Sequence, residues 1–133
     1  MYLLDSDYII YFLKGHLQTV DVIQKLSKTK LYTSIICVGE VLEGLYYSKR
    51  KNKKYLEIFE DFLKSLIVLD INKKVIQEFA ILRGRLRSKG KLIDNFDLLI
   101  ASTCLAYNLV LVTNNKSHFT RIPKLEIFKP DKN

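Results

Sequence analysis

The 133-residue sequence has few of the residues that divide a chain into separate parts, with only five glycines and two prolines. They do not gather into a Pro- or Gly-rich linker, and the sequence has no internal repeat and no low-complexity tract. A domain typically contains about 100 to 200 residues. We therefore predict a single domain over residues 1–133.

The sequence also lacks features of secreted and membrane proteins. No apolar run approaches the length of a membrane span, and Asp5 and Asp7 near the start argue against a signal peptide. The two cysteines, Cys37 and Cys104, both lie in apolar stretches and are expected as small core side chains in a reducing compartment. One disulfide between them is the alternative. We expect a cytoplasmic protein without membrane contact.

Basic residues outnumber acidic ones by 22 to 14, which gives a net charge of +8. This excess favours an anionic partner such as nucleic acid or an acidic protein segment, and the alternative is a basic surface without a dedicated partner. A weak candidate for contact with nucleic acid is the basic run that contains Lys49, Arg50, Lys51, Lys53 and Lys54. Such a run is more often a solvated surface.

Short apolar segments alternate with amphipathic ones along the chain, which is typical of an α/β domain with a mainly parallel sheet flanked by helices. The strands are expected near residues 2–4, 31–33, 67–69, 109–113 and 125–128. Expected helix N-caps are Ser6 or Asp7, Ser34, Asn72 and Asp94. The helix that Asn72 begins should end near Gly90, and the one before residue 67 should carry Leu56, Phe59, Phe62, Leu63 and Leu66.

Two carboxylates stand three residues apart at the start of an apolar helix. Asp94 is placed as its N-cap and Asp97 at its third position. Capping explains one acid but not the second. Side chains three residues apart on a helix lie about 5–6 Å from each other, so two carboxylates repel unless they are protonated, paired or bridged by a cation. The alternative is a pair of exposed acids.

Glu40 lies in a helix that is apolar almost all round, between Ile35 and Leu42. We therefore expect it to be at least partly buried, which is costly for a carboxylate without a partner or a metal ion. A salt bridge to one of the many basic residues is the alternative.

Asp5 and Asn115 each follow a predicted strand and should lie at the carboxyl edge of the sheet, where sites of parallel sheets form. Together with Glu40, Asp94 and Asp97, Asp5 would form an all-oxygen cluster. Neither histidine is placed with these acids, and no Cys/His ligand spacing appears. The cluster favours Mg²⁺ or Mn²⁺ over zinc, and with a basic protein it indicates phosphodiester cleavage by a metal-activated water.

The sequence resembles the PIN-domain nucleases, and among them the VapC-type toxins of toxin–antitoxin pairs. Four segments carry the resemblance, which covers essentially the whole chain: residues 3–7 (LLDSD), 38–44 (VGEVLEG), 93–101 (IDNFDLLIA) and 111–115 (LVTNN) with Phe119 after it.

The resemblance implies a three-layer α/β/α fold with metal-binding acids at the carboxyl edge of the sheet. Asp5, Glu40 and Asp97 match the three metal-binding acids, Asp94 matches a frequent fourth, and Ser6, Thr113 and Asn115 take supporting positions. Two residues depart from the family pattern. Asp7 stands where Asn is more frequent, and Asn115 where many PIN domains have an acid. We expect one tightly held ion, and the alternative is a second ion that arrives with the substrate.

The resemblance also implies partners: an RNA substrate, often tRNA or ribosomal RNA, a cognate VapB-like antitoxin, and a homodimer or a larger toxin–antitoxin assembly. The predicted function is that of a Mg²⁺- or Mn²⁺-dependent endoribonuclease toxin. The alternatives are a non-catalytic PIN-fold regulator that binds nucleic acid with a partner protein, and a nuclease that acts on DNA.

Overall fold

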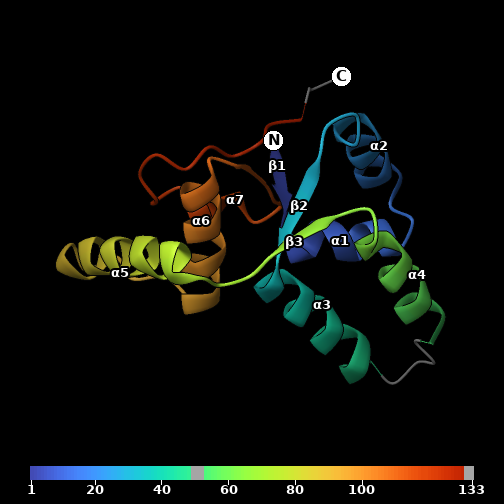
Figure 1. The fold of residues 1–133 in the computed structure, drawn as a ribbon, viewed down its shortest axis with the longest axis horizontal. Helices are drawn as coiled ribbons and strands as arrows, with labels where there is room; N and C mark the ends of the chain where they lie inside the picture. The colour runs from blue at the N-terminus through green and yellow to red at the C-terminus, as the bar shows by residue number, and fades with distance from the viewer. Residues whose placement is uncertain (49–52, 131–133) are drawn as a thin grey trace.

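The structure is a computed structural model and describes residues 1–48 and 53–130. Four parallel strands form one sheet in the order β3-β2-β1-β4 (Figure 1). The elements in chain order are β1 Tyr2–Leu4, α1 Ser6–Leu13, α2 Leu17–Leu26, β2 Leu31–Ser34, α3 Ile35–Tyr47, α4 Lys53–Leu63, β3 Ile67–Leu69, α5 Lys73–Ser88, α6 Asn95–Tyr107, β4 Val110–Val112 and α7 Lys116–Phe119. The predicted α/β class with a parallel sheet is confirmed.

Helices cover both faces of the sheet because neighbouring strand residues point in opposite directions. Leu4 packs in a cluster with Ile9 of α1 and Phe59 of α4, whereas Leu3 packs in a second cluster with Leu82 of α5 and Leu98 of α6. The same division is visible in Figure 1, where α5 and α6 lie on one side of the strands and α1, α2 and α4 on the other. The result is a three-layer α/β/α arrangement.

The carboxyl ends of the parallel strands meet at one edge of the sheet. Leu3 of β1 pairs with Tyr32 of β2 and with Leu111 of β4. The backbone N–H of Asp5 donates to the carbonyl of Val112 at 2.9 Å, so Asp5 lies beside the end of β4. The first residues after β1, β2 and β4 are therefore neighbours in space.

Most predicted helix caps are confirmed, and one is wrong. The side chains of Ser34, Asn72 and Asp94 accept N–H groups at the starts of α3, α5 and α6. The first helix, however, is capped by Asp5, whose backbone is extended and whose side chain accepts the N–H of Ser6. The neighbouring Ser6 is already the first residue of the helix, because the chain turns from strand to helix with no connecting loop.

Some predicted elements are shorter than expected. α4 ends at Leu63, and the N–H groups of residues 64–66 donate to carbonyls three residues back, which makes a tight turn that still buries Leu66. The predicted strand 125–128 forms only one parallel bridge, between Leu111 and Ile127. Its pairing with β4 consists of two backbone bonds, from Leu111 to Glu126 and from Phe128 to Leu111.

No helix within the two described ranges is long and apolar enough to cross a membrane. Both cysteines are buried and free, as predicted from their apolar surroundings, so the disulfide alternative is wrong.

Candidate functional site

Asp5 lies at the centre of the carboxyl edge, with only 4% of its surface exposed. Its Oδ1 accepts the N–H of Ser6 at 2.8 Å and lies 3.8 Å from the Cys37 thiol. Its Oδ2 accepts the Thr113 hydroxyl at 2.7 Å. Burial raises the pKa of Asp5, and the hydrogen bonds from Thr113 and Ser6 offset part of that rise. The chain therefore holds this carboxylate in a fixed position at an energetic cost.

Glu40 is half-buried on α3 and faces Asp5. The Ser6 hydroxyl donates to its Oε1 at 3.1 Å. Burial is the main cause that raises the pKa of Glu40 to about 7, and the negative charges of Asp5, Asp97 and Asp94 add to the effect. Within residues 1–48 and 53–130 Glu40 forms no ion pair, so the structure does not favour the alternative of a salt bridge.

Asp94 and Asp97 bring the start of α6 to the same place. Asp94 is exposed, and its Oδ2 accepts the N–H groups of Phe96 at 3.0 Å and Asp97 at 3.4 Å. The side chain of Asp97 is 20% exposed. Burial raises the pKa of Asp97, the charges of Asp5 and Asp94 raise it further, and nearby His118 lowers it. The four predicted acids therefore come from three separate parts of the chain and interact electrostatically.

The expectation that neither histidine lies with the acids is wrong, because His118 contacts Asp97. Its Nδ1 lies 3.3 Å from Asp97 Oδ2, and its side chain is 57% exposed. Among the described residues it is the only basic group that approaches these acids closely enough to form an ion pair. The order of the sequence gives no sign of this contact, because 21 positions separate the two residues and include a strand.

Asp7 adds a further carboxylate beside the cluster. Its Oδ2 accepts the backbone N–H of Asn114 at 3.0 Å, and its Oδ1 is buried without a hydrogen-bond partner among the described residues. Burial, followed by the charge of Asp5, raises the pKa of Asp7 to about 6. A buried acceptor without a donor is costly, which makes this edge of the sheet favourable for positive charge.

Thr113 and Asn115, which follow β4, border the acids on the side of that strand. The hydroxyl of Thr113 donates to Asp5 and accepts the backbone N–H of Asn115 at 3.0 Å. Asn115 is exposed, and its side chain makes no cap hydrogen bond to α7. Of the predicted supporting residues, Ser6 and Thr113 therefore contact the acids directly, whereas Asn115 contributes its backbone.

Cys37 lies against the acids and has potential ligand atoms close by. Its Sγ, one Asp5 oxygen and one Glu40 oxygen all lie within 4.8 Å of one another. Burial and the charge of Asp5 raise the thiol pKa well above its ordinary value, which favours the neutral thiol over the thiolate when no ion is bound. Its position one turn before Glu40 on the same face of α3 was the available sequence signal.

The donor set fits a hard cation. The ionisable groups are carboxylates whose charges are unfavourable next to one another, and a divalent cation would remove that repulsion. Softer ligands are absent from the described part of the cluster, apart from the neutral Cys37 thiol and the His118 ring, which contacts Asp97. The arrangement can therefore hold a small oxygen-preferring ion.

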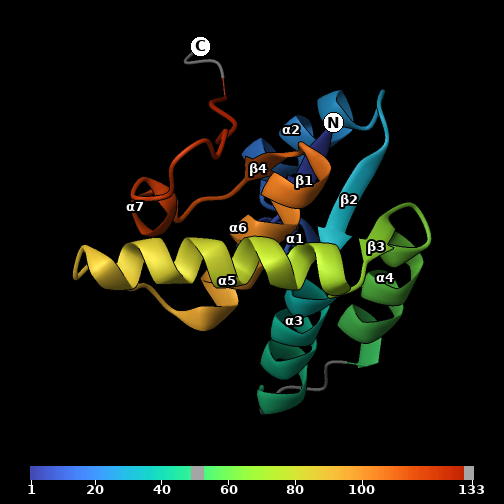
Figure 2. The same cartoon turned by 60° about the vertical axis from the view of Figure 1, so that its left-hand side comes forward.

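The structure describes only part of the predicted basic run. Lys49, Arg50 and Lys51 fall outside the described residues. Lys53 and Lys54 are exposed at the start of α4, which begins near the end of α3 that is remote from the sheet (Figure 2). The structure does not bring these two lysines to the acids.

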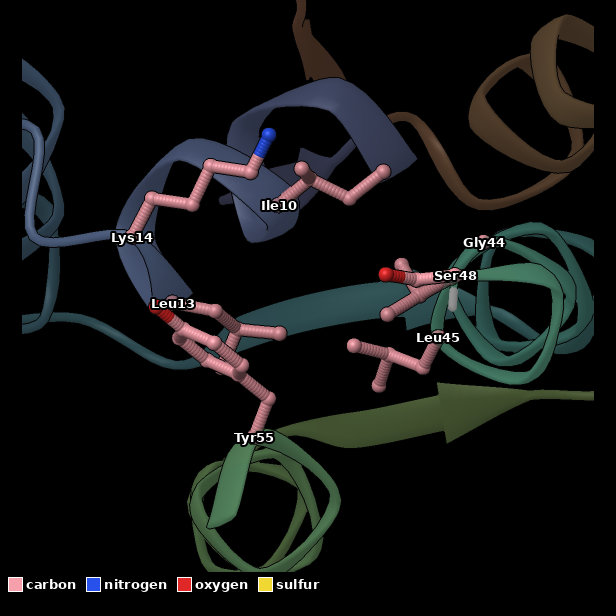
Figure 3. A pocket seen from close by; sticks show the side chains of 8 residues that line it. Ile10, Leu13, Lys14, Gly44, Leu45, Ser48 and Tyr55 are labelled. Atoms are coloured by element: carbon pink, nitrogen blue, oxygen red, sulfur yellow. The ribbon is translucent and has the colours of Figure 1, made fainter. Parts of the chain in front are cut away.

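One hollow lies away from the acid cluster, and a smaller one adjoins it. The larger, of about 550 Å³, opens between α1, α3 and α4 (Figure 3). Leu13, Leu45 and Tyr55 give it apolar walls, and Lys14 lies at its rim. The smaller, of about 320 Å³, is lined by Ile93, Asp94, Asp97, Ser117, His118 and Arg121.

Comparison with known proteins places the chain in a family. Residues 2–125 match the model of the PIN domain. The chain is 36% identical over 136 aligned positions to Ribonuclease VapC2 of Rickettsia felis, which covers 99% of both proteins. It is 31% identical over 126 positions to Ribonuclease VapC2 of Haemophilus influenzae, which covers 91% of both.

Solved structures give the same result. The crystal structure of VapBC2 from Rickettsia felis bound to a promoter DNA fragment matches with a TM-score of 0.88, 33% identity and 98% coverage of both chains. The DNA-bound VapBC of Salmonella typhimurium matches with a TM-score of 0.86, 28% identity and 96% coverage of both chains. The chain therefore belongs to the PIN-domain family and, within it, to the VapC group.

Proposed function

We propose that the protein is a divalent-metal-dependent endoribonuclease and the toxin component of a toxin–antitoxin pair. One observation carries the proposal: Asp5, Glu40, Asp94 and Asp97 act on one another electrostatically at the carboxyl edge of the sheet. No lysine or arginine forms an ion pair with them in the described part of the chain. Such an arrangement is unfavourable without a cation and useful with one.

The names of the relatives support RNA as the substrate. Several are ribonucleases, and one at 28% identity over 130 positions is the tRNA(fMet)-specific endonuclease VapC of Salmonella typhimurium, with 95% coverage of both chains. We infer RNA cleavage for this chain, with tRNA or ribosomal RNA as the expected class. The net charge of +8 fits a polyanionic substrate.

We assign the roles of the acids from their surroundings. Asp5, Glu40 and Asp97 would hold Mg²⁺ or Mn²⁺, since they are the partly or fully buried members of the cluster. Asp94 is exposed and would contact the water shell or orient the attacking water. The bound ion would supply a water of lowered pKa and positive charge for the phosphate in the transition state. Ser6 and Thr113 fix Glu40 and Asp5 through their hydroxyls.

The partner is inferred from the solved relatives, which are VapBC complexes. We propose a VapB-like antitoxin, and we assign an apolar segment of it to the hollow between α1, α3 and α4 (Figure 3), whose lining is mainly aliphatic and aromatic. Lys14 at the rim would favour acidic residues in that segment. The homodimer, the larger assembly and the cytoplasmic location stay predictions.

The test is cleavage of an RNA pool by the purified chain after removal of any bound partner. We expect cleavage with Mg²⁺ or Mn²⁺, loss of cleavage with a chelator, and loss of at least about 100-fold in Asp97→Asn. Glu60→Gln is the matched control because it removes an exposed acid on α4 and should cleave like the wild type.

Two results would contradict the proposal. RNA binding without cleavage under any divalent metal ion would favour the non-catalytic regulator. Cleavage of duplex DNA but not of RNA would favour a DNA nuclease.

A further inference from the structure

A second feature adjoins the acid cluster: the hollow of about 320 Å³ described above, which we call the flanking pocket. Ile93, Asp94 and Asp97 line it from the start of α6, and Ser117, His118 and Arg121 line it from the segment after β4. Because Asp94 and Asp97 belong to both, the pocket opens directly onto the acids. Its volume is at the lower end of the range for small-ligand sites, about 300 to 1,000 Å³, and so suits one nucleotide better than a helix.

The two sides of the pocket differ in charge. The α6 side carries Asp94 and Asp97, whereas the opposite side carries Arg121 and His118. His118 already contacts Asp97. Arg121 is exposed and has no carboxylate partner within residues 1–48 and 53–130. A guanidinium without a carboxylate partner is well suited to a phosphate group, which it can bind through two parallel hydrogen bonds.

The remaining lining residues complement a nucleotide. Ser117 is exposed and offers a hydroxyl, and the half-buried Ile93 offers an apolar surface. A nucleotide of single-stranded RNA combines an anionic phosphate with the apolar face of an unstacked base. A duplex keeps its bases stacked inside and would leave the Ile93 side of the pocket without a partner.

We propose that the flanking pocket binds the nucleotide next to the scissile phosphate of a single-stranded RNA segment. Arg121 and Ser117 contact its phosphate, and the base lies against Ile93. Arg121 is then a specificity-determining residue that places the strand across the acids. This inference rests on the proposed ribonuclease function, which it deepens by assigning one substrate subsite.

The test compares Arg121→Gln with Lys30→Gln in steady-state cleavage of a single-stranded RNA with Mg²⁺. Both variants remove one exposed positive charge, but Lys30 precedes β2 at the opposite, amino edge of the sheet. We expect the KM of Arg121→Gln to rise about tenfold, the value of one charge-assisted phosphate contact, with kcat changed less than about twofold. Arg121→Lys should recover part of the loss, and Lys30→Gln should match the wild type.

A binding measurement separates this inference from the proposed function. With chelator present, the Kd of a fluorescent RNA oligonucleotide should rise about tenfold in Arg121→Gln, and the slope of log Kd against log salt should fall by about one. If the wild type binds the RNA but does not cleave it, the weaker binding by Arg121→Gln would still support nucleotide binding in the flanking pocket, whereas the proposed ribonuclease function would fail.

Two results would overturn the inference. One is cleavage by the wild type together with an unchanged KM and salt slope in Arg121→Gln. The other is that Arg121→Gln leaves the KM for RNA unchanged but weakens the binding of a poly-glutamate peptide. That result would assign the pocket to an acidic protein segment.

Discussion

Thr113 connects the residues that follow β1 and β4 through a single hydroxyl. It donates to the buried Asp5 Oδ2 at 2.7 Å and accepts the backbone N–H of Asn115 at 3.0 Å. Its one proton is used by Asp5, so the 3.5 Å approach to Asp7 Oδ2 is not a second donation from the same group. The hydroxyl therefore fixes the orientation of Asp5 toward Glu40.

Replacing this hydroxyl tests its role. Thr113→Val keeps the shape of the side chain but leaves Asp5 Oδ2 without its donor. We expect RNA cleavage to fall about 10- to 100-fold, as is typical for partners that orient metal ligands. Thr113→Ser retains the hydroxyl and serves as the control, with activity close to that of the wild type. Equal activity of the valine variant and the wild type would show that Thr113 does not orient Asp5.

Sequence reasoning at this scale succeeded where a residue's own neighbours decide its environment. The apolar residues around Glu40 predicted its partial burial, and the position of Asp94 predicted its N-cap role. It could not find the contact between His118 and Asp97 or that between Asp7 and Asn114. These contacts depend on which side chains the sheet brings together, and no local pattern encodes them.

The start of α6 combines a structural and a chemical use of one carboxylate. Asp94 caps the helix through Phe96 and Asp97, and its charge raises the pKa values of Asp97 and Glu40. A substitution can separate the two uses, because Asn caps a helix about as well as Asp but carries no charge.

We predict that Asp94→Ala lowers the free energy of unfolding by about 1 kcal/mol, the usual value of a lost N-cap. Asp94→Asn keeps the cap and removes one repulsive charge, so it should be at least as stable as the wild type and should still cleave RNA more slowly. Urea denaturation and cleavage assays on the same preparations measure both effects. If Asp94→Asn cleaved like the wild type, Asp94 would have only a capping role.

The sequence predicted the presence of the helices and strands better than it predicted the residues at which they begin and end. The apolar run at 109–113 predicted a buried strand, and β4 occupies its middle, Val110–Val112. The first helix cap was wrong because Asp5, Ser6 and Asp7 are all good capping residues, and only the abrupt end of β1 selects Asp5. The segment 125–128 has the apolar composition of a strand, but composition cannot reveal that it meets β4 at one bridge only.

At the scale of the whole molecule, alternating strands and helices predicted the layers, but not the strand order β3-β2-β1-β4. That order places β1 between β2 and β4, and so it surrounds Asp5 with the residues that follow the other two strands. The acid cluster is therefore a consequence of topology, and it makes global stability depend on the charge state of the site.

The direction of this dependence follows from the raised pKa values. Glu40 titrates near pH 7 and Asp7 near pH 6 in the folded chain, against ordinary values of 4.5 and 3.8, and the pKa values of Asp5 and Asp97 are also raised. Between pH 4 and 7 the folded state therefore binds more protons than the unfolded state, so the free energy of unfolding falls as the pH rises. A cation bound only by the folded state opposes this loss.

The central claim is that four acids from three separate parts of the chain form one site for a hard divalent ion. It is tested most directly by urea denaturation from pH 5 to 8, with chelator and with Mg²⁺. With chelator we predict that the free energy of unfolding falls toward pH 8 and that it falls less in Asp97→Asn. Glu43 is an exposed acid on the same helix as Glu40, so the control variant Glu43→Gln should behave like the wild type. Mg²⁺ should stabilise the wild type at pH 8 and have little effect on Asp97→Asn. A free energy of unfolding that neither falls with pH nor responds to Mg²⁺ would contradict the account.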